Sequence, residues 1–348
     1  MSVENYKCPG CGAPVVFKPE LGGFKCNYCY STFTEEEITK HFKELSDSES
    51  EAEEVVAGEG EIKQYSCSNC GAQVVAGDTS TTAFCYYCHS PVVITARLKG
   101  KFKPDRIIPF KINKEEAVQT FLKWAKGKKF VPRDFTSTMQ QEKISGIYLP
   151  YWTGDVVADI DYHAIGNSVS VSRSGSTEYT TTKKFQIDRT GKAEINNIQE
   201  IAFSKIDRNL LNGITPFEEE EEKEFSAGYM AGFFSEQYDI DEEHINPEIM
   251  TRAKQNTLSM IQNSIECGSL EDVEDNTNYE LRDMRYTLLP SWILTYLYKG
   301  KTYVFAINGQ TGKANGELPL SKPKLWFSAL RIAAIIATAL LLGGRFIW

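Results

Sequence analysis

Eight of the nine cysteines follow one spacing that occurs twice in the chain. Each set has two Cys-x2-Cys pairs with 14 residues between them, and the second set lies 59 positions after the first. Four thiolates hold Zn²⁺ in a tetrahedron that leaves no place for water, so such sets are structural sites rather than Lewis-acid sites. The sequence therefore predicts two tandem zinc ribbons with two Zn²⁺ ions, whose ligands are Cys8, Cys11, Cys26, Cys29, Cys67, Cys70, Cys85 and Cys88.

The residues around the cysteines repeat with the same offset, which indicates a duplicated module. Gly12 and Gly71 follow the second cysteine of each set, where the turn of the chain requires a positive φ. Other residues that recur 59 positions later include Ala13, Val15, Val16, Tyr28 and Ser31. A unit of about 25 residues is too small to be stabilised by its hydrophobic core, so metal binding supplies its folding free energy.

Paired cysteines also occur in disulfide frameworks and in Cys-x2-Cys redox centres. The first seven residues, Met1 to Lys7, are polar, and no apolar stretch that would form a signal peptide follows them. We therefore expect reduced cysteines in a reducing compartment. His89 directly follows Cys88, and we expect a surface histidine there because four thiolates already complete the site.

The strongest polar pattern outside the cysteines is Asp155, Asp159, Asp161 and His163, which would share one face of a strand. Carboxylates beside a histidine can bind a metal or perform acid/base catalysis. The alternative is the solvated side of an antiparallel sheet, with Val156, Ala158, Ile160 and Tyr162 facing inward. The chain has no P-loop, dinucleotide fingerprint or nucleophile motif, so we expect no enzyme and assign no catalytic or cofactor-binding residue.

Two smaller features have simple interpretations. The acidic run Glu218 to Glu222 suits the positive end of a helix dipole, which we favour over a calcium site. Cys267, the ninth cysteine, lies near the end of an expected helix that Gly268 would cap, and we expect a small buried residue.

The expected fold is two tandem zinc-ribbon β modules, a mixed α+β body with antiparallel sheets, and a single C-terminal transmembrane helix. The boundaries are 1–33 for ribbon 1, 34–62 for an acidic linker, 63–97 for ribbon 2, 103–320 for the body and 325–348 for the transmembrane helix. In the body, helices are expected from the capping residue Asn113 to Gly127, from Phe225 to Tyr238 and from Pro247 to Cys267. Strands are expected over 156–160, 168–172, 178–187, 291–298 and 302–308, with turns at 189–191 and 309–312.

Short sequence words suggest that the body consists of two related halves. The words 107–110 (IIPF) and 149–152 (LPYW) occur in the same order as 214–217 (ITPF) and 289–292 (LPSW). The separations are 107 and 140 residues, so an insertion would be required. Coincidence of short apolar words is the alternative, because proline before an aromatic residue is common at strand edges.

The C-terminal segment from Leu325 to Trp348 is long enough to cross a bilayer as a helix. Its arginines, Arg331 and Arg345, lie near the two ends, where they could reach the interfaces. Lys322 and Lys324 precede it, which predicts a single-pass protein of the cell membrane with a cytoplasmic N-terminal body. An in-plane interfacial helix and a buried terminal helix are the alternatives.

Nucleic acid is the first partner to consider for zinc ribbons, and binding to phosphate requires clustered Lys and Arg. Ribbon 2 contains one formal charge, Asp78, between Gln64 and Thr95, and the whole chain has a net charge of −9. The acidic runs 35–37 and 47–54 would repel a polyanion, and we expect a solvated, disordered linker there. Nucleic acid is therefore not the expected partner.

Taken together, these motifs resemble a known family, the bacterial membrane-anchored double zinc-ribbon (TFIIB-type zinc-ribbon-containing) proteins of the YdjG type. The resemblance covers nearly the whole chain and rests on the paired CxxCG ribbons and on the segments 108–110 (IPF), 148–152 (YLPYW), 174–185, 228–234 (GYMAGFF, expected as a helix) and 305–312. It implies a role at the membrane, in envelope stress, together with an SPFH (flotillin-like) protein, a PspA-type phage-shock protein and a second membrane protein. It assigns the eight cysteines as zinc ligands and no residue of the body.

We therefore expect a non-enzymatic membrane-tethered scaffold whose zinc ribbons and body recruit partner proteins, and which also binds a second copy of itself. The alternative is a membrane-associated nucleic-acid-binding regulator, for which retention of DNA or RNA with a steep salt dependence would be the distinguishing observation.

Overall fold

The computed structural model describes residues 6–46, 63–67, 73–77, 79–85, 91–94, 97–98, 100–132, 135, 144–298 and 300–344. Several residues singled out from the sequence lie outside these ranges, namely Cys70, Cys88, His89, the acidic run 47–54 and Arg345 to Trp348.

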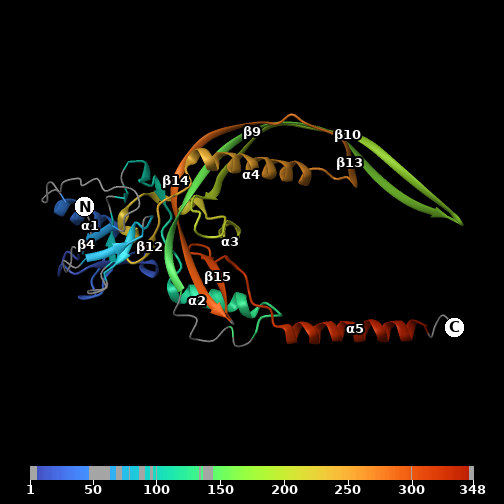
Figure 1. Ribbon diagram of the computed structural model, residues 1–348. Helices are drawn as coiled ribbons and strands as arrows, with labels where there is room; N and C mark the ends of the chain where they lie inside the picture. The colour runs from blue at the N-terminus through green and yellow to red at the C-terminus, as the bar shows by residue number, and fades with distance from the viewer. Residues whose placement is uncertain are drawn as a thin grey trace.

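One nine-stranded sheet organises the body (Figure 1). Its main path is β10-β9-β14-β15-β16, with the bounds Thr177–Ile201, Ile144–Ser174, Asn278–Tyr298, Lys301–Asn308 and Ala314–Gly316. Four shorter strands pair at its sides, which are β8 Arg106–Ile107, β11 Lys223–Glu224, β12 Phe234–Ser235 and β13 Ser269–Asp275. The hairpin of β9 and β10 arches far beyond the other strands.

Within the ranges given above, five α-helices and several 3₁₀ turns accompany the sheet. The helices are α1 Glu35–Ser46, α2 Lys114–Lys126, α3 Arg208–Asn212, α4 Glu242–Asn263 and α5 Lys322–Gly344. The 3₁₀ turns include η1 Pro19–Leu21, η3 Gly100–Phe102, η6 Glu219–Glu221 and η7 Ala227–Met230. Figure 1 shows α4 beneath the arch of β9 and β10, α2 beside β15, and α5 extending away from the sheet.

The two ribbons have small sheets of their own. Ribbon 1 is a three-stranded sheet of β1 Val15–Lys18, β2 Gly23–Cys26 and β3 Thr32–Phe33. In ribbon 2, β4 Lys63–Ser66 pairs with β5 Gln73–Ala76, and β6 Thr82–Phe84 pairs with β7 Pro91–Val93.

The expectation of a disordered linker is wrong for its first part, because α1 begins directly after ribbon 1. Thr34 and Glu37 form a reciprocal cap: the Thr34 N–H donates to the Glu37 carboxylate at 2.8 Å, and the Glu37 N–H donates to Thr34 Oγ1 at 3.3 Å. Ile38 is buried against the core. The acidic residues that follow Thr34 therefore support a helix start rather than a solvated chain.

The expected fold class is also wrong in its proportion of β sheet and in the direction of the strands. The chain is mostly β sheet, and the large sheet is mixed rather than antiparallel, because β12 pairs in parallel with β9 and β8 pairs in parallel with β14. Each of these parallel strands has only two residues. A strand of two residues has no alternation of polar and apolar side chains, so its sequence gives no strand signal.

The expected C-terminal transmembrane helix, and with it the single-pass location in the cell membrane, is corrected by the structure. Among the residues described, up to Gly344, no helix combines the length and the apolar character needed to cross a membrane. Lys322, Lys324 and Arg331 occupy the first half of α5. The uncharged run from Ile332 to Gly344 spans about 20 Å at about 1.5 Å per residue, which is short of a hydrocarbon core of about 30 Å.

The pairing of β9 with β14 gives the body a pseudo-twofold arrangement. Leu149 pairs with Leu289 at the centre of this pseudo-twofold relation, so the segments 149–152 (LPYW) and 289–292 (LPSW) start at this pair and run in opposite directions. Each central strand forms a hairpin with its outer neighbour, β9 with β10 and β14 with β15. The short parallel strands obey the same relation, because Ile147 pairs with Phe234 of β12 as Thr287 pairs with Arg106 of β8.

Hydrogen bonds donated by two tryptophans repeat this relation. Trp292 Nε1 donates to the carbonyl oxygen of Ile112 at 3.0 Å, and Trp152 Nε1 donates to that of Ile240 at 3.0 Å. Each acceptor is the residue directly before a helix N-cap, which is Asn113 for α2 and Asp241 for α4. The tryptophans therefore fix where both helices begin.

Backbone hydrogen bonds show the same repetition. Ile108 N donates to Leu288 O at 3.0 Å, and Glu236 N donates to Tyr148 O at 3.2 Å. The Gly309 carbonyl accepts bonds from the N–H groups of residues 111 and 112, and the Ala202 carbonyl likewise accepts bonds from those of 239 and 240. The place of the word 107–110 is thus taken by residues 235–238. The expected match of 107–110 with 214–217 is wrong, because the two segments are similar in sequence but lie in different structural surroundings.

The two halves follow one another in the chain: the first contains α2, β9 and β10, and the second contains α4, β14 and β15. Each helix packs on the hairpin of the other half. Phe121 and Trp124 of α2 pack on Phe305 of β15, with ring centroids 5.2 and 5.7 Å apart. Ile249 of α4 lies against Gly154 of β9, where a Cβ would approach within 2.8 Å of its side chain. Each helix therefore covers the hairpin of the other half, and one core joins both halves.

Other expected elements have mixed outcomes. The cap of the first body helix is confirmed: Asn113 Oδ1 accepts from Glu116 N at 2.9 Å, and Glu116 bonds back to the Asn113 N–H. The helix expected from Phe225 to Tyr238 is wrong, because this segment forms η7 and β12. The turn expected at 189–191 is also wrong, because β10 continues through it in register with β9.

Replacing either tryptophan with phenylalanine tests the repeated bond. We expect Trp152→Phe and Trp292→Phe each to lower the free energy of unfolding by about 1 kcal/mol, because each leaves a carbonyl beside a helix start without its donor. Urea unfolding followed by circular dichroism measures the loss. Trp326→Phe is the control, since Trp326 is exposed on α5 and should change stability by less than about 0.5 kcal/mol. Equal stability of all three variants would contradict this role.

Candidate metal centre and the adjoining groove

The four cysteines of ribbon 1 come together at one point. The Sγ atoms of Cys8, Cys11, Cys26 and Cys29 all lie within 4.8 Å of one another. Cys8 and Cys26 are buried, whereas Cys11 and Cys29 are exposed. Two of the Sγ separations, from Cys8 to Cys29 and from Cys11 to Cys26, are 3.6 Å. The site can therefore hold a metal ion at the surface of the ribbon.

The two turns that supply these cysteines have matching backbone geometry. In the first turn, Cys8 N donates to Ala13 O at 2.7 Å and Gly12 N donates to Cys8 O at 2.9 Å. In the second, Cys26 N donates to the carbonyl oxygen of residue 31 at 2.9 Å, and the N–H of residue 30 donates to Cys26 O at 3.0 Å. Each turn thus places its two thiols in the same relative geometry.

Positive φ recurs at equivalent places of the two turns. Gly12 has φ 72° and Tyr30 has φ 62°. Glycine takes this conformation without steric cost, whereas a tyrosine is held in it by its surroundings. N–H groups also point at sulfur: Tyr28 N lies 3.4 Å and Cys29 N lies 3.5 Å from Cys26 Sγ. Such donors stabilise a thiolate, which is the form that binds metal.

The pKa values of the thiols differ within the cluster. The Ser31 hydroxyl, 3.3 Å from Cys29 Sγ, contributes most to lowering the pKa of Cys29 to about 6. The Ala13 N–H lowers the pKa of Cys11, but desolvation and the three neighbouring thiols outweigh it and raise that pKa to about 12. Closely spaced like charges oppose further ionisation, and a divalent cation removes that opposition. Four sulfur donors with N–H support suit Zn²⁺.

Ribbon 2 is described only in part. Cys67 and Cys85 are buried in a small core with Tyr65, Val92 and Ile94. The other two expected ligands and His89 lie outside the described residues, so the second zinc site stays a prediction.

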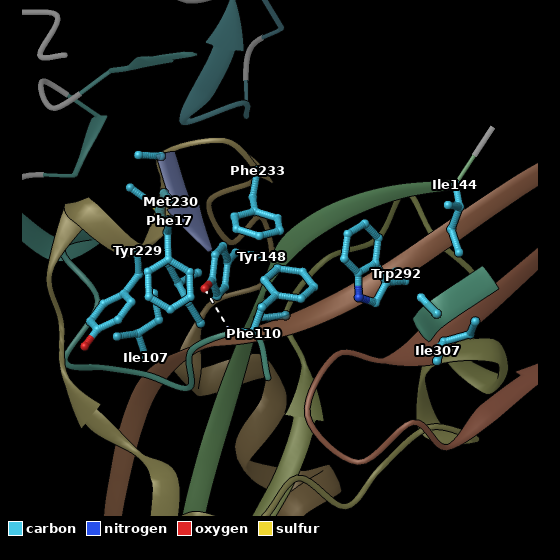
Figure 2. Close-up of a cluster of buried hydrophobic side chains, with 14 of the residues drawn as sticks. Phe17, Ile107, Phe110, Ile144, Tyr148, Tyr229, Met230, Phe233, Trp292 and Ile307 are labelled. Atoms are coloured by element: carbon cyan, nitrogen blue, oxygen red, sulfur yellow. Dashed lines mark hydrogen bonds between the residues drawn. The ribbon is translucent and has the colours of Figure 1, made fainter. Parts of the chain in front are cut away.

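The segment 227–237, which we call the clasp, joins ribbon 1 to the body (Figure 2). Phe17 N donates to Ala231 O at 2.9 Å, and the Phe17 ring packs on Tyr229 with centroids 5.0 Å apart. Gly228 lies against Phe24, and a Cβ there would meet that ring at 3.1 Å. The sequence signal was the pair of glycines, Gly228 and Gly232, which permit close packing but do not suit the expected helix.

The metal site is packed against this contact. Phe24 and Cys26 lie on the same strand, β2, and both belong to the core cluster that also contains Tyr229. The Tyr229 hydroxyl bonds to Glu35 of α1 and accepts a bond from Lys223 Nζ at 2.8 Å. The geometry of the thiol cluster is thus coupled through β2 to the clasp.

The other end of the clasp holds ribbon 2. Thr79 Oγ1 and Ser80 Oγ donate to the Glu236 carboxylate at 2.6 and 2.9 Å. Thr81 N donates to Ser235 O at 2.8 Å. The rings of Phe84 and Phe234 meet edge to face at 5.2 Å. One short segment therefore contacts both ribbons while its β12 strand is paired with β9.

A groove of about 810 Å³ opens where the two ribbons, the clasp and the sheet converge. Its apolar lining includes Phe233, Phe234 and Trp292 (Figure 2 labels Phe233 and Trp292). Ribbon 1 contributes Tyr28, which is 79% exposed, to the lining of the groove, and ribbon 2 contributes Pro91. The sequence did not predict the groove, because its lining comes from several segments that lie far apart in the chain.

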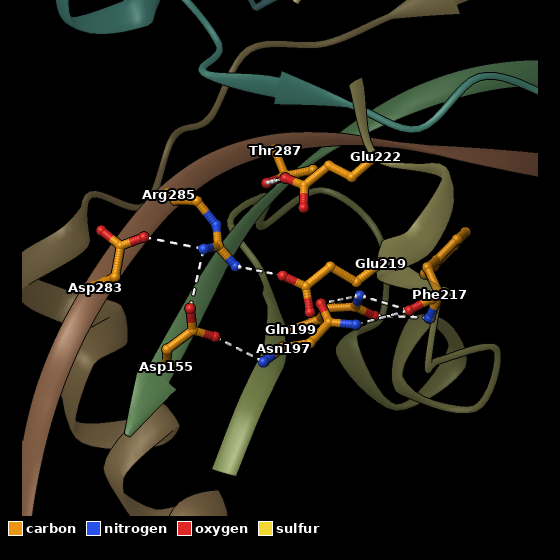
Figure 3. A network of polar contacts seen from close by, with 9 residues as sticks. All are labelled: Asp155, Asn197, Gln199, Phe217, Glu219, Glu222, Asp283, Arg285 and Thr287. Atoms are coloured by element: carbon orange, nitrogen blue, oxygen red, sulfur yellow. Dashed lines mark hydrogen bonds and ion pairs between the residues drawn. The ribbon is translucent and has the colours of Figure 1, made fainter. Parts of the chain in front are cut away.

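The polar residues expected on one strand face do not form a single site. Asp155 pairs with Arg285 at 3.0 Å in a network that also contains Asp283 and Glu219 (Figure 3). Asp159 is exposed and belongs neither to this network nor to the group around His163 described below. The inward positions of the strand agree with the solvated-face interpretation, because Val156, Ala158 and Tyr162 are buried and Ile160 is half-buried.

His163 forms the second polar group. Its Nδ1 lies 2.6 Å from Asp188 and its Nε2 lies 2.9 Å from Asp161. Bonds to Asp188 and then to Asp161 raise the pKa of His163, and the bond to His163 lowers the pKa of Asp188. The pair with Asp188 joins β9 to β10 at an exposed position, whereas Asp161 lies on β9 with His163.

The acidic run and the ninth cysteine have structural roles. Glu219 to Glu221 form η6 rather than the start of an α-helix, and Glu219 pairs with Arg285. Glu222 is half-buried, and burial raises its pKa. Cys267 is half-buried rather than fully buried, with its thiol 3.3 Å from Ser269 O.

Cys8→Ser tests the metal centre. We expect the wild-type chain to contain two zinc ions and Cys8→Ser to contain one, because three thiolates and a hydroxyl hold Zn²⁺ more weakly. Elemental analysis measures the content, and hydrogen exchange at the Phe17 amide should become faster as its contact with the clasp loosens. Cys267→Ser is the control and should leave the metal content unchanged. Retention of the full metal content by Cys8→Ser would contradict the assignment.

The His163 ion pairs predict a pH-dependent stability. The folded state binds the His163 proton more tightly than the unfolded state, so this contribution is fully present below the ordinary pKa of 6.5 and is lost as pH rises through the raised folded pKa. The stability difference between wild type and His163→Gln, measured by urea unfolding, should therefore shrink from pH 6 to pH 9. Asp159→Asn on the same strand is the control. A difference that stays constant over this range would disprove the linkage.

Comparison with known proteins gives one relative over the whole chain. The uncharacterized protein YdjG of Bacillus subtilis (strain 168) is 31% identical over 358 aligned residues, which cover 99% of this chain and 100% of that protein. No family model matches the chain. No solved structure matches it either.

Proposed function

Because the chain belongs to the same family as Bacillus subtilis YdjG, a protein described as uncharacterized, we propose its function from its geometry. It is a non-catalytic adaptor that binds an extended segment of a partner protein between its zinc ribbons and its central sheet. The single observation that carries this proposal is the open groove of about 810 Å³ at their junction.

The floor of the groove supports an extended partner. Ile144 to Gly146 line it, and β14 pairs with one edge of this stretch. On the opposite edge, β12 pairs with β9 only at residues 147 and 148, and the pairing of β10 with β9 begins only at Tyr151 of β9. Within the described part of the chain, no strand occupies the edge beside Ile144 to Gly146. A partner segment can add there as a strand, with backbone hydrogen bonds supplying affinity.

The side chains of the groove support a protein partner rather than a polyanion. Aromatic side chains have few rotatable bonds and bind at low entropic cost, as the exposed Tyr28 and Phe234 would here. The charged residues that line the groove are balanced, with two lysines and two glutamates, Lys18, Lys114, Glu20 and Glu115. Phosphate binding requires an excess of positive charge, which this set lacks.

Zinc has a supporting role in this proposal. Each ion holds the turns of one ribbon, and ribbon 1 presents Tyr28 from the turn that carries Cys26 and Cys29. The family resemblance supplies candidate partners, an SPFH (flotillin-like) protein and a PspA-type protein acting in envelope stress. Recruitment of such proteins through the groove is the specific form of the proposal.

Binding of the full chain to immobilised SPFH-type and PspA-type proteins tests the adaptor role. We expect Tyr28→Ala to weaken binding on the order of tenfold or more, since removal of an aromatic anchor costs about 2 kcal/mol. Surface plasmon resonance measures the dissociation constant.

Leu21→Ala is the matched control, because Leu21 is exposed on the same ribbon and does not line the groove. It should leave the dissociation constant within about twofold. Equal binding by wild type and Tyr28→Ala would exclude the groove as the docking surface. Retention of DNA with a steep salt dependence would favour the nucleic-acid-binding alternative instead.

A further inference from the structure

Beyond Asn167 the hairpin of β9 and β10 continues as two strands alone (Figure 1). We call residues 168–183 the arm. The register of β13 with β9 ends at Asn167, and β10 is the terminal strand of the sheet. Over the residues that the structure describes, no third strand pairs with the arm. A two-stranded hairpin alone is marginally stable in water, and an unpaired edge is a template for another strand.

The side chains of the arm favour strand pairing. Val169, Val171 and Tyr179 are 59%, 58% and 55% exposed, respectively. The outer strand contains three consecutive threonines, Thr180 to Thr182, and β-branched residues favour strands. The arm has no proline, and its register with β9 is continuous, so neither of these common protections of an edge is present.

The charges of β10 are complementary to those of a second copy. Residues directly opposite each other in an antiparallel pair share one face, so two copies of one strand related by a twofold axis pair residues of equal parity. An axis through Thr181 places Glu178 opposite Lys184 of the second copy, twice by symmetry. An axis through Thr180 or Thr182 would place Glu178 opposite a threonine or a glutamine. The charges therefore select one register.

The existing ion pairs extend this complementarity. Arg173 pairs with Glu178 at 2.8 Å, and Lys184 pairs with Glu271 at 2.7 Å. In the selected register these four residues form a row of alternating charge across the two copies. The same register places Thr180 opposite Thr182 of the second copy, with Val171 and Val169 on the adjacent inner strands of the same face.

We propose that the arm is a dimerisation element, in which β10 pairs with β10 of a second copy of this chain about a twofold axis at Thr181. The result is a continuous four-stranded ribbon, β9-β10-β10-β9. It requires no residue of the groove and is independent of the adaptor role. The contact is small compared with the interfaces of stable dimers, so the dissociation constant is expected in the micromolar range.

Sedimentation velocity of the full chain between about 1 and 200 µM tests the proposal. Wild type should show a reversible monomer–dimer equilibrium. Glu178→Lys and Lys184→Glu should each raise the dissociation constant on the order of tenfold, because each places like charges opposite each other twice. The double variant Glu178→Lys/Lys184→Glu should recover the wild-type constant, since it exchanges the two charges and keeps their attraction.

Glu271→Gln is the matched control, because it removes the partner of Lys184 within the chain and leaves the contact between copies intact. It should stay within about twofold of wild type. A monomer at every concentration would overturn the proposal. So would a dimer whose constant is the same in the wild type and both single variants, since that dimer would use another surface. Circular dichroism confirms that each variant is folded.

Discussion

The pairing of β9 with β14 is the interaction on which the other parts of the structure depend. Its centre, Leu149 opposite Leu289, relates two hairpins, and each central strand directs a tryptophan to the start of a helix. Because each helix covers the hairpin of the other half, neither half completes a hydrophobic layer alone. The body is therefore one cooperative unit although its hydrogen-bond pattern occurs twice.

The clasp connects this unit to the two ribbons. Its β12 strand is aligned by β9, while Tyr229 packs on ribbon 1 and Glu236 accepts bonds from ribbon 2. The ribbons are thus fixed relative to the sheet by a segment of about eleven residues, rather than by a flexible linker. This arrangement gives the groove a defined shape, because its walls belong to elements that one segment aligns.

The sequence predicted features that depend on local spacing. The cluster formed by the four cysteines of ribbon 1 follows from their two Cys-x2-Cys pairs. The cap of α2 follows from Asn113 and Glu116, and the buried face of β9 follows from the alternation of apolar and polar residues around Val156. It could not predict the clasp, whose two-residue strand has no periodicity and whose glycines matter only through contacts with distant rings. The C-terminal helix was expected to cross a membrane from its overall apolar content, whereas Lys322, Lys324 and Arg331 leave an uncharged run that is too short.

The position of the clasp in the chain has a consequence for biosynthesis. Phe17 and its contact Ala231 are separated by about 200 residues, which require roughly 10 to 40 s of translation at about 5 to 20 residues per second. During this interval ribbon 1 has emerged but lacks the surface that covers Phe17 and Phe24. A metal ion held by the four thiols would then have to sustain its fold. Supply of metal to the nascent chain would thus precede, and permit, the later assembly of the body around the ribbon.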